Sequence, residues 1–168
     1  MIALKTILVA TDFSDASEAA WRYGRALAHA FGASLHVLHV VPDGFAWAGV
    51  AEAGVVSPSL YREWEGNARR RLELMLSEHE RQQLRVTLAV KTGEPVREII
   101  GYAVRQGIDL AVLGTRGKGP VEHLLLGSVA ERVVRFAPCP VLTVRARQHE
   151  FVVEALESAR AMPAPVIA

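Results

Sequence analysis

Three things are scarce in this sequence, and each scarcity argues against a class of protein. Cysteine occurs once, as Cys139, so the chain cannot form an internal disulfide and fits a reducing cytosol. The formal net charge is only +1, from 19 basic and 18 acidic residues, which argues against binding to nucleic acid or to an anionic membrane. No apolar run is long enough to span a bilayer, and the start of the chain lacks the pattern of a signal peptide. We therefore expect a cytoplasmic protein.

Apolar residues, by contrast, make up 51% of the 168 residues, which is enough for one domain with a substantial core. Continuous or alternating apolar runs predict strands over about residues 7–10, 35–41, 86–90, 109–113 and 141–144. Apolar residues at helical spacing predict helices over about residues 14–31, 59–82, 95–106 and 128–136. Strands and helices that alternate in this way predict an α/β fold, with a parallel sheet and helices on both of its faces.

A glycine-rich stretch follows the expected fourth strand and ends at the last helix. It contains Gly114 and Gly117, then nine further residues, then Gly127 and Ser128. Glycine lets a backbone turn sharply and approach a ligand closely, and the N–H groups at a helix start attract phosphate. The stretch is not a Walker A loop, which needs glycine, lysine and a hydroxyl residue in succession. It is not a dinucleotide fingerprint either, because that would need a glycine at position 122. Its spacing nevertheless predicts a phosphate-binding loop.

At these residues the chain resembles the universal stress protein family, in its ATP-binding branch. The resemblance covers about residues 3–145, and it includes ILVATDFS (7–14), LLGSVAE (125–131) and APCPVLTV (137–144). It implies a universal stress protein domain over residues 1–145, and we expect residues 146–168 to form a tail that is a short helix or is disordered. It also implies an open five-stranded parallel sheet of strand order 3-2-1-4-5, which is Rossmann-like and similar to the adenine nucleotide alpha hydrolases.

The resemblance implies that ATP binds at the carboxyl ends of the strands. The general rule for open α/β sheets predicts the same place, between strands one and four. There Ala10, Thr11 and Asp12 end the first strand. The Asp12 carboxylate is expected to accept hydrogen bonds from ribose hydroxyls or from the adenine amino group. Val40 or Val41, at the end of the second strand, is expected to contact adenine through backbone groups and apolar surface.

The ribose and the phosphates are expected to lie against the glycine-rich stretch. The resemblance implies that six residues of this stretch bind the nucleotide: Gly114, Arg116, Gly117, Gly127, Ser128 and Val129. The last three would offer backbone N–H groups, together with the Ser128 hydroxyl, to the β- and γ-phosphates. The charge of the phosphates predicts that Mg²⁺ or Mn²⁺ binds with the nucleotide.

Several of these residues also have a structural interpretation. Asp12 and Ser128 can each cap a helix, because capping and phosphate binding use the same geometry, and Arg116 can be an ordinary surface arginine. His36 and His39 lie three positions apart on a strand, so they point to opposite faces and cannot share one metal ion. We therefore expect no metal site built from side chains, and no catalytic residue stands out.

The function implied by the resemblance is regulatory, that of a nucleotide sensor in the stress response. Hydrolysis of ATP is expected to be slow or absent, because no evident base or water-positioning carboxylate accompanies the loop. The resemblance implies a homodimer through the fifth strand, whose apolar edge at Val141 to Val144 would otherwise be exposed, and an unidentified protein partner. The alternatives left open are an interaction module of the same fold that works without nucleotide, a slow ATPase or nucleotidyl transferase, and AMP or cyclic AMP as the ligand.

Overall fold

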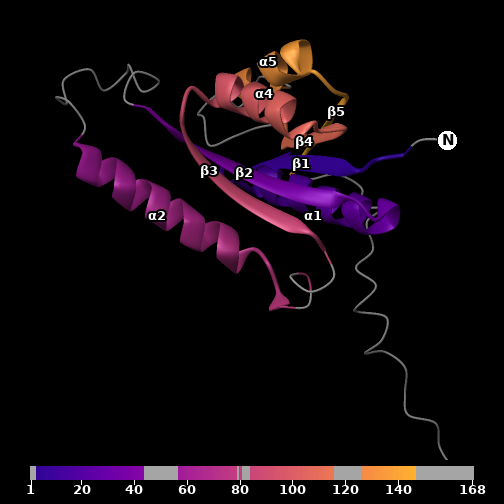
Figure 1. The fold of residues 1–168 in the computed structure, drawn as a ribbon. Coiled ribbons are helices and arrows are strands. Elements are labelled where there is room, and N and C mark those ends of the chain that lie inside the picture. Colours follow the sequence, from indigo (N-terminus) through magenta and orange to yellow (C-terminus); the bar gives the residue numbers. More distant parts are fainter. Residues whose placement is uncertain (1–2, 44–56, 79, 81–83, 116–125, 147–168) are drawn as a thin grey trace, which may run out of the picture.

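The computed structural model describes residues 3–43, 57–78, 80, 84–115 and 126–146 (Figure 1). Its strands are β1 (Thr6–Ala10), β2 (Ser34–Pro42), β3 (Val86–Gly93), β4 (Leu110–Gly114) and β5 (Val141–Val144). Its helices are α1 (Asp15–Phe31), α2 (Pro58–Leu74), α4 (Pro95–Gln106) and α5 (Ser128–Phe136). Apart from the ends of β3 and α2, the elements begin and end within about one residue of the positions that the apolar patterns predict.

The strands form one parallel sheet of order β3-β2-β1-β4-β5, which confirms the expected α/β fold and strand order. β1 is the central strand, and Ala10 at its end pairs with Leu38 on one side and Leu113 on the other. β2 continues past this point and pairs with β3 as far as Pro42. The carboxyl edge of the sheet is therefore stepped, because β2 and β3 extend beyond the end of β1.

Helices cover both faces of the sheet (Figure 1). A strand covered on both faces needs apolar residues on both, and β1 places Ile7 and Val9 on one face and Leu8 on the other. The face with Ile7 and Val9 packs against α1 and α2, and the face with Leu8 packs against α4 and α5. Each helix can cover the sheet in this way because its buried residues recur along one stripe.

Local sequence signals determine where the helices begin and end. Ser14 caps α1, where its side chain accepts a hydrogen bond from the Ser17 N–H, and Pro95 occupies the first turn of α4. Gly32 and Gly107 follow α1 and α4 with φ angles of 62° and 58°. Glycine adopts this left-handed conformation without strain, which explains why both helices end at the expected glycines.

One carboxylate joins the amino ends of β1 and β4. Asp109 Oδ2 accepts hydrogen bonds from the backbone N–H groups of Lys5 and Thr6, at 2.7 and 2.9 Å. The Asp109 N–H donates in turn to the Thr6 carbonyl, at 2.9 Å. Hydrogen bonds to an ionised carboxylate are stronger than those between neutral groups, so this link holds the two strands together at the edge of the sheet opposite the end of β1.

The expected helix over residues 59–82 is wrong at its end, because α2 stops at Leu74. Ser77 starts a new turn. Its N–H and hydroxyl donate to Glu80 Oε2 at 2.7 and 2.6 Å, and the Glu80 N–H donates back to Ser77 Oγ at 3.3 Å. This reciprocal pairing is a capping box, which begins a helical turn. Burial opposes ionisation of Glu80, but the hydrogen bonds from Ser77 and the Arg25 guanidinium outweigh burial and lower the pKa of Glu80.

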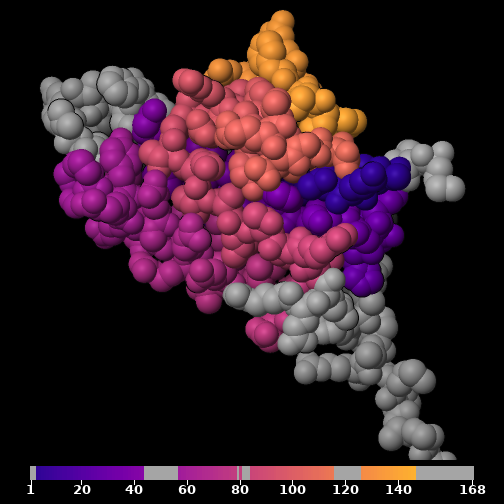
Figure 2. All heavy atoms as spheres, viewed as in Figure 1, coloured from indigo at the N-terminus to yellow at the C-terminus, as the bar shows by residue number. Residues whose placement is uncertain are grey.

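α5 and the edge strand β5 lie at one end of the sheet, and α5 projects there from the molecule (Figure 2). Val134 and Phe136 on α5 are 49% and 57% exposed. Val141 and Leu142 on β5 are only half-buried. This end of the molecule therefore combines an edge strand with exposed apolar side chains.

Candidate functional site

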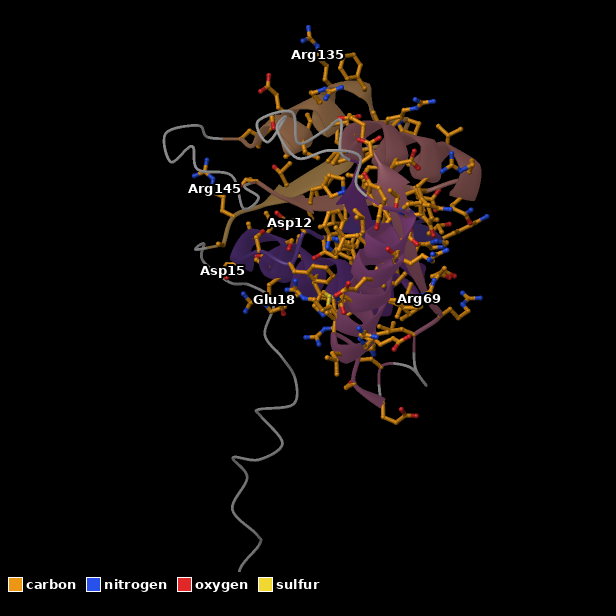
Figure 3. All side chains as sticks on the ribbon, turned by 90° about the vertical axis from the view of Figure 1, so that its left-hand side faces the viewer. Asp12, Asp15, Glu18, Arg69, Arg135 and Arg145 are labelled. Carbon is orange, nitrogen blue, oxygen red and sulfur yellow. The ribbon has the colours of Figure 1, made fainter. Side chains whose placement is uncertain are left out.

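The candidate site lies at the edge of the sheet where β1 and β4 end. The chain runs from β1 through α1 to β2 on one side, while β4 lies on the other side. Open α/β sheets bind ligands where the strand order reverses in this way. Figure 3 looks onto this edge, where Asp12 follows β1. Arg116 and Gly117 lie outside the described residues, and the structure describes all the other predicted site residues.

Thr11 holds the turn between β1 and α1, and its side chain is turned inward. It is 5% exposed. Its N–H donates to the Leu38 carbonyl at 2.9 Å. Its hydroxyl accepts from the Phe13 N–H and donates to Ser17 Oγ, both at 3.0 Å. The predicted site residue Thr11 therefore has its side chain occupied by structural hydrogen bonds, which fix the path of the chain into α1.

Asp12 lies before the cap of α1 and is partly exposed. Its Oδ1 accepts hydrogen bonds from the Ser14 N–H at 3.1 Å and from the Ser14 hydroxyl at 2.6 Å. An aspartate that bonds to the backbone two residues ahead forms an Asx turn. The capping residue of α1 is Ser14, so the structural alternative that Asp12 is itself the cap is wrong. The orientation of the Asp12 carboxylate depends on the backbone of this turn.

The end of β4 and the start of α5 are held together by backbone hydrogen bonds. The Thr115 N–H donates to the Val144 carbonyl at 2.7 Å, and the Gly127 N–H donates to the Thr115 carbonyl at 2.6 Å. Residues 115 and 127 thus meet although eleven residues separate them in the sequence. The end of β4 and the start of α5 therefore lie next to each other, and the Gly127 N–H, which was expected to bind phosphate, is used in this contact.

Gly114 and Gly127 do not use the backbone freedom expected of them. The glycines with positive φ are Gly32, Gly93 and Gly107 among the described residues, and Gly127 has an extended conformation with φ of −69°. At Gly114 the requirement is space, because a Cβ would lie 2.6 Å from the Ala16 carbonyl carbon. Glycine there lets the end of β4 approach the first turn of α1.

The start of α5 has no side-chain cap. Gly127 is the capping residue and has no side chain that could accept a hydrogen bond from the first turn, whereas Ser14, Ser57 and Glu94 cap α1, α2 and α4 with their side chains. Ser128 is the first residue of α5 and is exposed, so the alternative that Ser128 is the cap is wrong. The N–H groups of the first turn carry partial positive charge, and they lie beside the end of β4.

The predicted adenine contacts Val40 and Val41 lie on the part of β2 that extends past β1. Their side chains are 9% and 4% exposed, and Val40 packs in the core under α4. Their backbones pair with Lys91 and Thr92 of β3. Since the side chains are buried, a ligand at this edge would meet these residues mainly through their backbone.

Two residues near this turn, Phe13 and Arg71, were missed by the sequence reasoning, and His39 was considered only as a metal ligand. Phe13 has a positive φ of 60°. Its ring lies against the His39 ring, with 4.5 Å between ring centroids, and the Arg71 guanidinium lies 3.9 Å from the Phe13 centroid. Arg71 is 58 residues from Phe13 in the sequence, so no local pattern connects the two. The sequence around Phe13 did contain a signal for an unusual backbone, because Phe13 follows an aspartate and precedes a helix cap, a pattern typical of an Asx turn.

His36 and His39 lie on opposite faces of the sheet, as expected. His36 Nδ1 is 2.9 Å from the Tyr102 hydroxyl of α4, and His39 Nδ1 is 2.8 Å from the Thr11 carbonyl. Burial lowers the pKa of His36 and raises the pKa of Tyr102.

Within the described ranges, no three histidine, cysteine, aspartate or glutamate residues cluster to hold a metal ion. Among the same residues, none of the helices combines the length and the apolar character that a membrane span requires.

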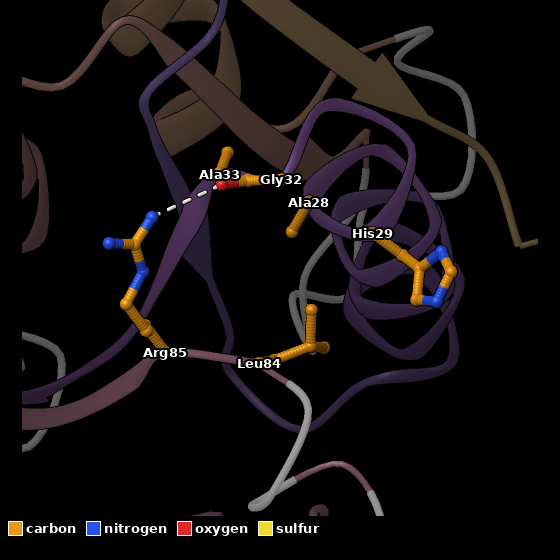
Figure 4. A pocket seen from close by; sticks show the side chains of 6 residues that line it. All are labelled: Ala28, His29, Gly32, Ala33, Leu84 and Arg85. Carbon is orange, nitrogen blue, oxygen red and sulfur yellow. Dashed lines mark hydrogen bonds between the residues drawn. The ribbon is translucent and has the colours of Figure 1, made fainter.

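A separate hollow of about 300 Å³ opens near the amino ends of β2 and β3 (Figure 4). Its lining residues are Ala28, His29, Gly32, Ala33, Leu84 and Arg85. Arg85 donates a hydrogen bond to the Gly32 carbonyl at 3.2 Å, which engages part of the guanidinium. Because parallel strands all run the same way, this hollow lies at the edge opposite Asp12 and is no part of the candidate site.

Comparison with known proteins agrees with this geometry. The model of the universal stress protein family matches residues 3–145. Universal stress protein MJ0531 of Methanocaldococcus jannaschii is 34% identical over 149 residues, covering 87% of this chain and 85% of its own length. A universal stress protein of Thermus aquaticus is 39% identical over 144 residues, covering 84% of this chain and 98% of its own length.

Solved structures show the same fold. Hypothetical protein MJ0577, also from Methanocaldococcus jannaschii, aligns with a TM-score of 0.75 at 28% identity, covering 89% of this chain and 100% of the other. A universal stress protein in complex with cAMP aligns with a TM-score of 0.57 at 25% identity, covering 87% of this chain and 100% of the other. With the family model matching most of its length, this chain belongs to the universal stress protein family.

Proposed function

We propose that the protein binds ATP at the carboxyl edge of β1 and β4 and acts as a regulatory nucleotide sensor in the stress response. The observation that carries the proposal is the hydrogen bond from the Gly127 N–H to the Thr115 carbonyl, at 2.6 Å. It holds the start of α5, which has no side-chain cap, against the end of β4. The partial positive charge of a helix start suits phosphates, and a carboxylate on the same edge suits ribose hydroxyls or an adenine amino group.

Each residue has a distinct role in this proposal. Asp12 accepts hydrogen bonds from the nucleoside, and Val40 and Val41 meet adenine through their backbones. Ser128 and Val129 offer N–H groups to the phosphates. The other proposed contacts are with Ala10, Gly114, Arg116, Gly117 and Gly127, while Thr11 contributes by holding the turn. Mg²⁺ or Mn²⁺ would be held mainly by the phosphates, whose charge it would neutralise.

One relative supports an adenine ligand. A universal stress protein that shares this fold was solved in complex with cAMP. We propose ATP rather than AMP or cyclic AMP, because a row of N–H groups at a helix start can bind more than one phosphate. Hydrolysis is expected to be slow or absent. Asp12 is the one carboxylate among the proposed site residues, and it is assigned to the nucleoside, so no residue of the proposal acts as a base for an attacking water.

We also propose that the protein is a homodimer, works in the cytoplasm and has a protein partner that reads the nucleotide state. Pairing of β5 with a second copy would cover the edge strand and the half-buried Val141 and Leu142. Residues 1–145 are proposed as the universal stress protein domain and residues 146–168 as a tail. The alternatives are an interaction module that needs no nucleotide and a slow ATPase or nucleotidyl transferase.

A cap substitution tests the binding site without disturbing the fold. Gly127 has φ and ψ of −69° and 152°, which any residue adopts, so Gly127→Asp should fold normally and cap α5 with its carboxylate. The same carboxylate should occupy the N–H groups and repel phosphate. In isothermal titration with ATP and Mg²⁺, the wild type should release or absorb heat, and Gly127→Asp should bind at least tenfold more weakly, as expected when an unpaired charge is placed against a phosphate.

The matched control is Ser57→Asp, which places a carboxylate at the cap of α2 instead. It should leave the affinity for ATP within about twofold of wild type, because Ser57 is not among the proposed contacts and an exposed charge is weakened by salt. Titrations with AMP and cyclic AMP distinguish the ligands, and analysis of the nucleotide after incubation distinguishes a sensor from an ATPase. Absence of binding by the wild type, or equal binding by Gly127→Asp, would contradict the proposed site.

A further inference from the structure

The turn that presents Asp12 contains an unfavourable backbone conformation. Phe13, the next residue, has a φ of 60° and is the only non-glycine with positive φ among the described residues. This region is disfavoured for a residue with a bulky side chain, because Cβ crowds the carbonyl oxygen. Such a conformation persists only where the surrounding contacts enforce it. The contacts of the Phe13 side chain therefore help to determine the shape of the turn.

The Phe13 ring contacts two partners from different elements. The Arg71 guanidinium of α2 lies over the ring, 3.9 Å from its centroid, which is a cation–π distance. The ring of His39, on β2, lies 4.5 Å from the Phe13 ring at an angle of 34°. We call these three residues the Phe13 stack. Together they join the turn to a strand and a helix that are distant from it in the sequence.

His39 also holds the turn directly. Its Nδ1 is 2.8 Å from the Thr11 carbonyl, and since a carbonyl only accepts, the Nδ1–H is the donor. His39 thus fixes the residue before Asp12 by a hydrogen bond and the residue after it by ring contact. Asp12 lies between two anchored neighbours, and its Oδ1 is bonded to Ser14 in the same turn.

We propose that Arg71, Phe13 and His39 are positioning residues, which hold Asp12 in the orientation that binds the nucleoside. The inference rests on the proposed function and extends it to a helix that has no predicted contact with the nucleotide. The stack acts through the backbone of residues 11–14, because the direction of the Asp12 carboxylate depends on that backbone. Arg71 also links the position of α2 to the affinity of the site. Loss of the stack reduces the fraction of molecules that are ready to bind, and the affinity falls by the same factor.

The test removes the cation while keeping the hydrophobic stem. Arg71→Met should weaken binding of ATP with Mg²⁺ by about two- to fivefold, the range expected from an exposed cation–π contact. Arg71→Lys keeps the charge and should recover most of the loss. Arg70→Met is the matched control. Arg70 is the preceding residue of α2, and its guanidinium donates to Asn67 on the same helix. The Arg70→Met variant should bind ATP as the wild type does.

A second measurement needs no nucleotide. The Phe13 N–H donates to Thr11 Oγ1 and the Ser14 N–H donates to Asp12 Oδ1, so the hydrogen-exchange rates of these two amides report the order of the turn. Arg71→Met should raise both rates, and Arg70→Met should raise neither. Unchanged exchange and unchanged affinity in folded Arg71→Met would overturn the inference.

The two measurements separate this inference from the proposed function. If the wild type binds no ATP, the proposed function fails, while the exchange rates of the Phe13 and Ser14 amides still decide whether Arg71 orders the turn. If the wild type binds ATP and Arg71→Met alters exchange without altering affinity, the nucleotide site stands and the positioning role of the stack is refuted. Faster exchange, weaker binding and rescue by Arg71→Lys together support it.

Discussion

Two glycines of this molecule serve different purposes. A Cβ on Gly114 would lie 2.6 Å from the Ala16 carbonyl carbon and 2.7 Å from the Ser17 nitrogen, and these backbone atoms cannot yield without displacing α1. A Cβ on Gly66, inside α2, would meet nothing within 4 Å. Gly114 is therefore required for the close approach of β4 and α1, whereas Gly66 only lowers the stability of its helix.

Alanine at the two positions should have opposite effects. Gly114→Ala should lower the free energy of unfolding by about 1–3 kcal/mol through overpacking. Gly66→Ala should raise it by about 0.5–1 kcal/mol, because alanine loses less backbone entropy in a helix. Urea unfolding followed by circular dichroism measures both changes. Equal stability of Gly114→Ala and the wild type would show that β4 and α1 are not in the contact described.

His36 makes stability depend on pH. Burial lowers the pKa of its imidazole below the ordinary value of 6.5, so below about pH 6.5 the unfolded chain binds a proton that the folded chain does not. The free energy of unfolding should therefore fall as the pH decreases from 7.5 to 5.5, with a slope of at most about 1.4 kcal/mol per pH unit from this residue. Urea unfolding at several pH values measures the slope.

The matched variant removes the imidazole and its partner together. Replacement of His36 alone would leave the buried Tyr102 hydroxyl without its 2.9 Å contact to His36 Nδ1. Replacement of both side chains by apolar ones can be nearly neutral. The double variant His36→Leu/Tyr102→Phe should therefore fold and lose this part of the pH dependence. If its slope between pH 7.5 and 5.5 equals that of the wild type, another group is responsible.

At the scale of the element, the capping box after α2 begins a helical turn at Ser77. Ser77→Ala removes the hydroxyl that bonds to Glu80 in both directions, and loss of a helix cap costs about 1 kcal/mol. Ser77→Asp supplies another acceptor at the cap and should lose less. Thermal unfolding of the two variants ranks them, and a Ser77→Ala protein as stable as the wild type would contradict a capping role.

The elements themselves were largely predictable from the sequence. Continuous apolar runs revealed the buried strands, and Gly32 and Gly107 marked the helix ends because the left-handed conformation there needs glycine. The end of α2 was missed because the apolar spacing continues through Met75 and Leu76, past the last residue of the helix, Leu74. Periodicity reports which face is buried, but it does not reveal that the helix has been interrupted.

The position of the candidate site residues was predictable where it depends on strand ends. Asp12 and Gly114 lie at the carboxyl edge because parallel strands all end there, and Gly127 lies beside them through its hydrogen bond to Thr115. What the sequence did not reveal is contact between distant residues. The space that Gly114 requires is set by Ala16 and Ser17, and the Phe13 stack depends on Arg71 of α2. Such requirements arise only when the chain has folded.

At the scale of the whole molecule, the exposed end formed by α5 and β5 predicts self-association. Sedimentation equilibrium should give twice the chain mass of 18.3 kDa, because an apolar edge strand is a ready site for pairing with a second copy. Thr143→Lys places a charge on β5 and should shift the mass toward the monomer. A monomeric wild type at micromolar concentration would refute the proposed dimer.

The link that Asp109 makes between β1 and β4 limits how the protein can respond to a ligand. Strands tied at the amino ends and paired along their length cannot hinge apart, so the central framework keeps one shape whether or not the site is filled. Any response to the proposed nucleotide is then left to the helices and connections around these two strands. The proposed partner would distinguish the two states by contact with those surrounding parts, since the β1–β4 pair is the same in both.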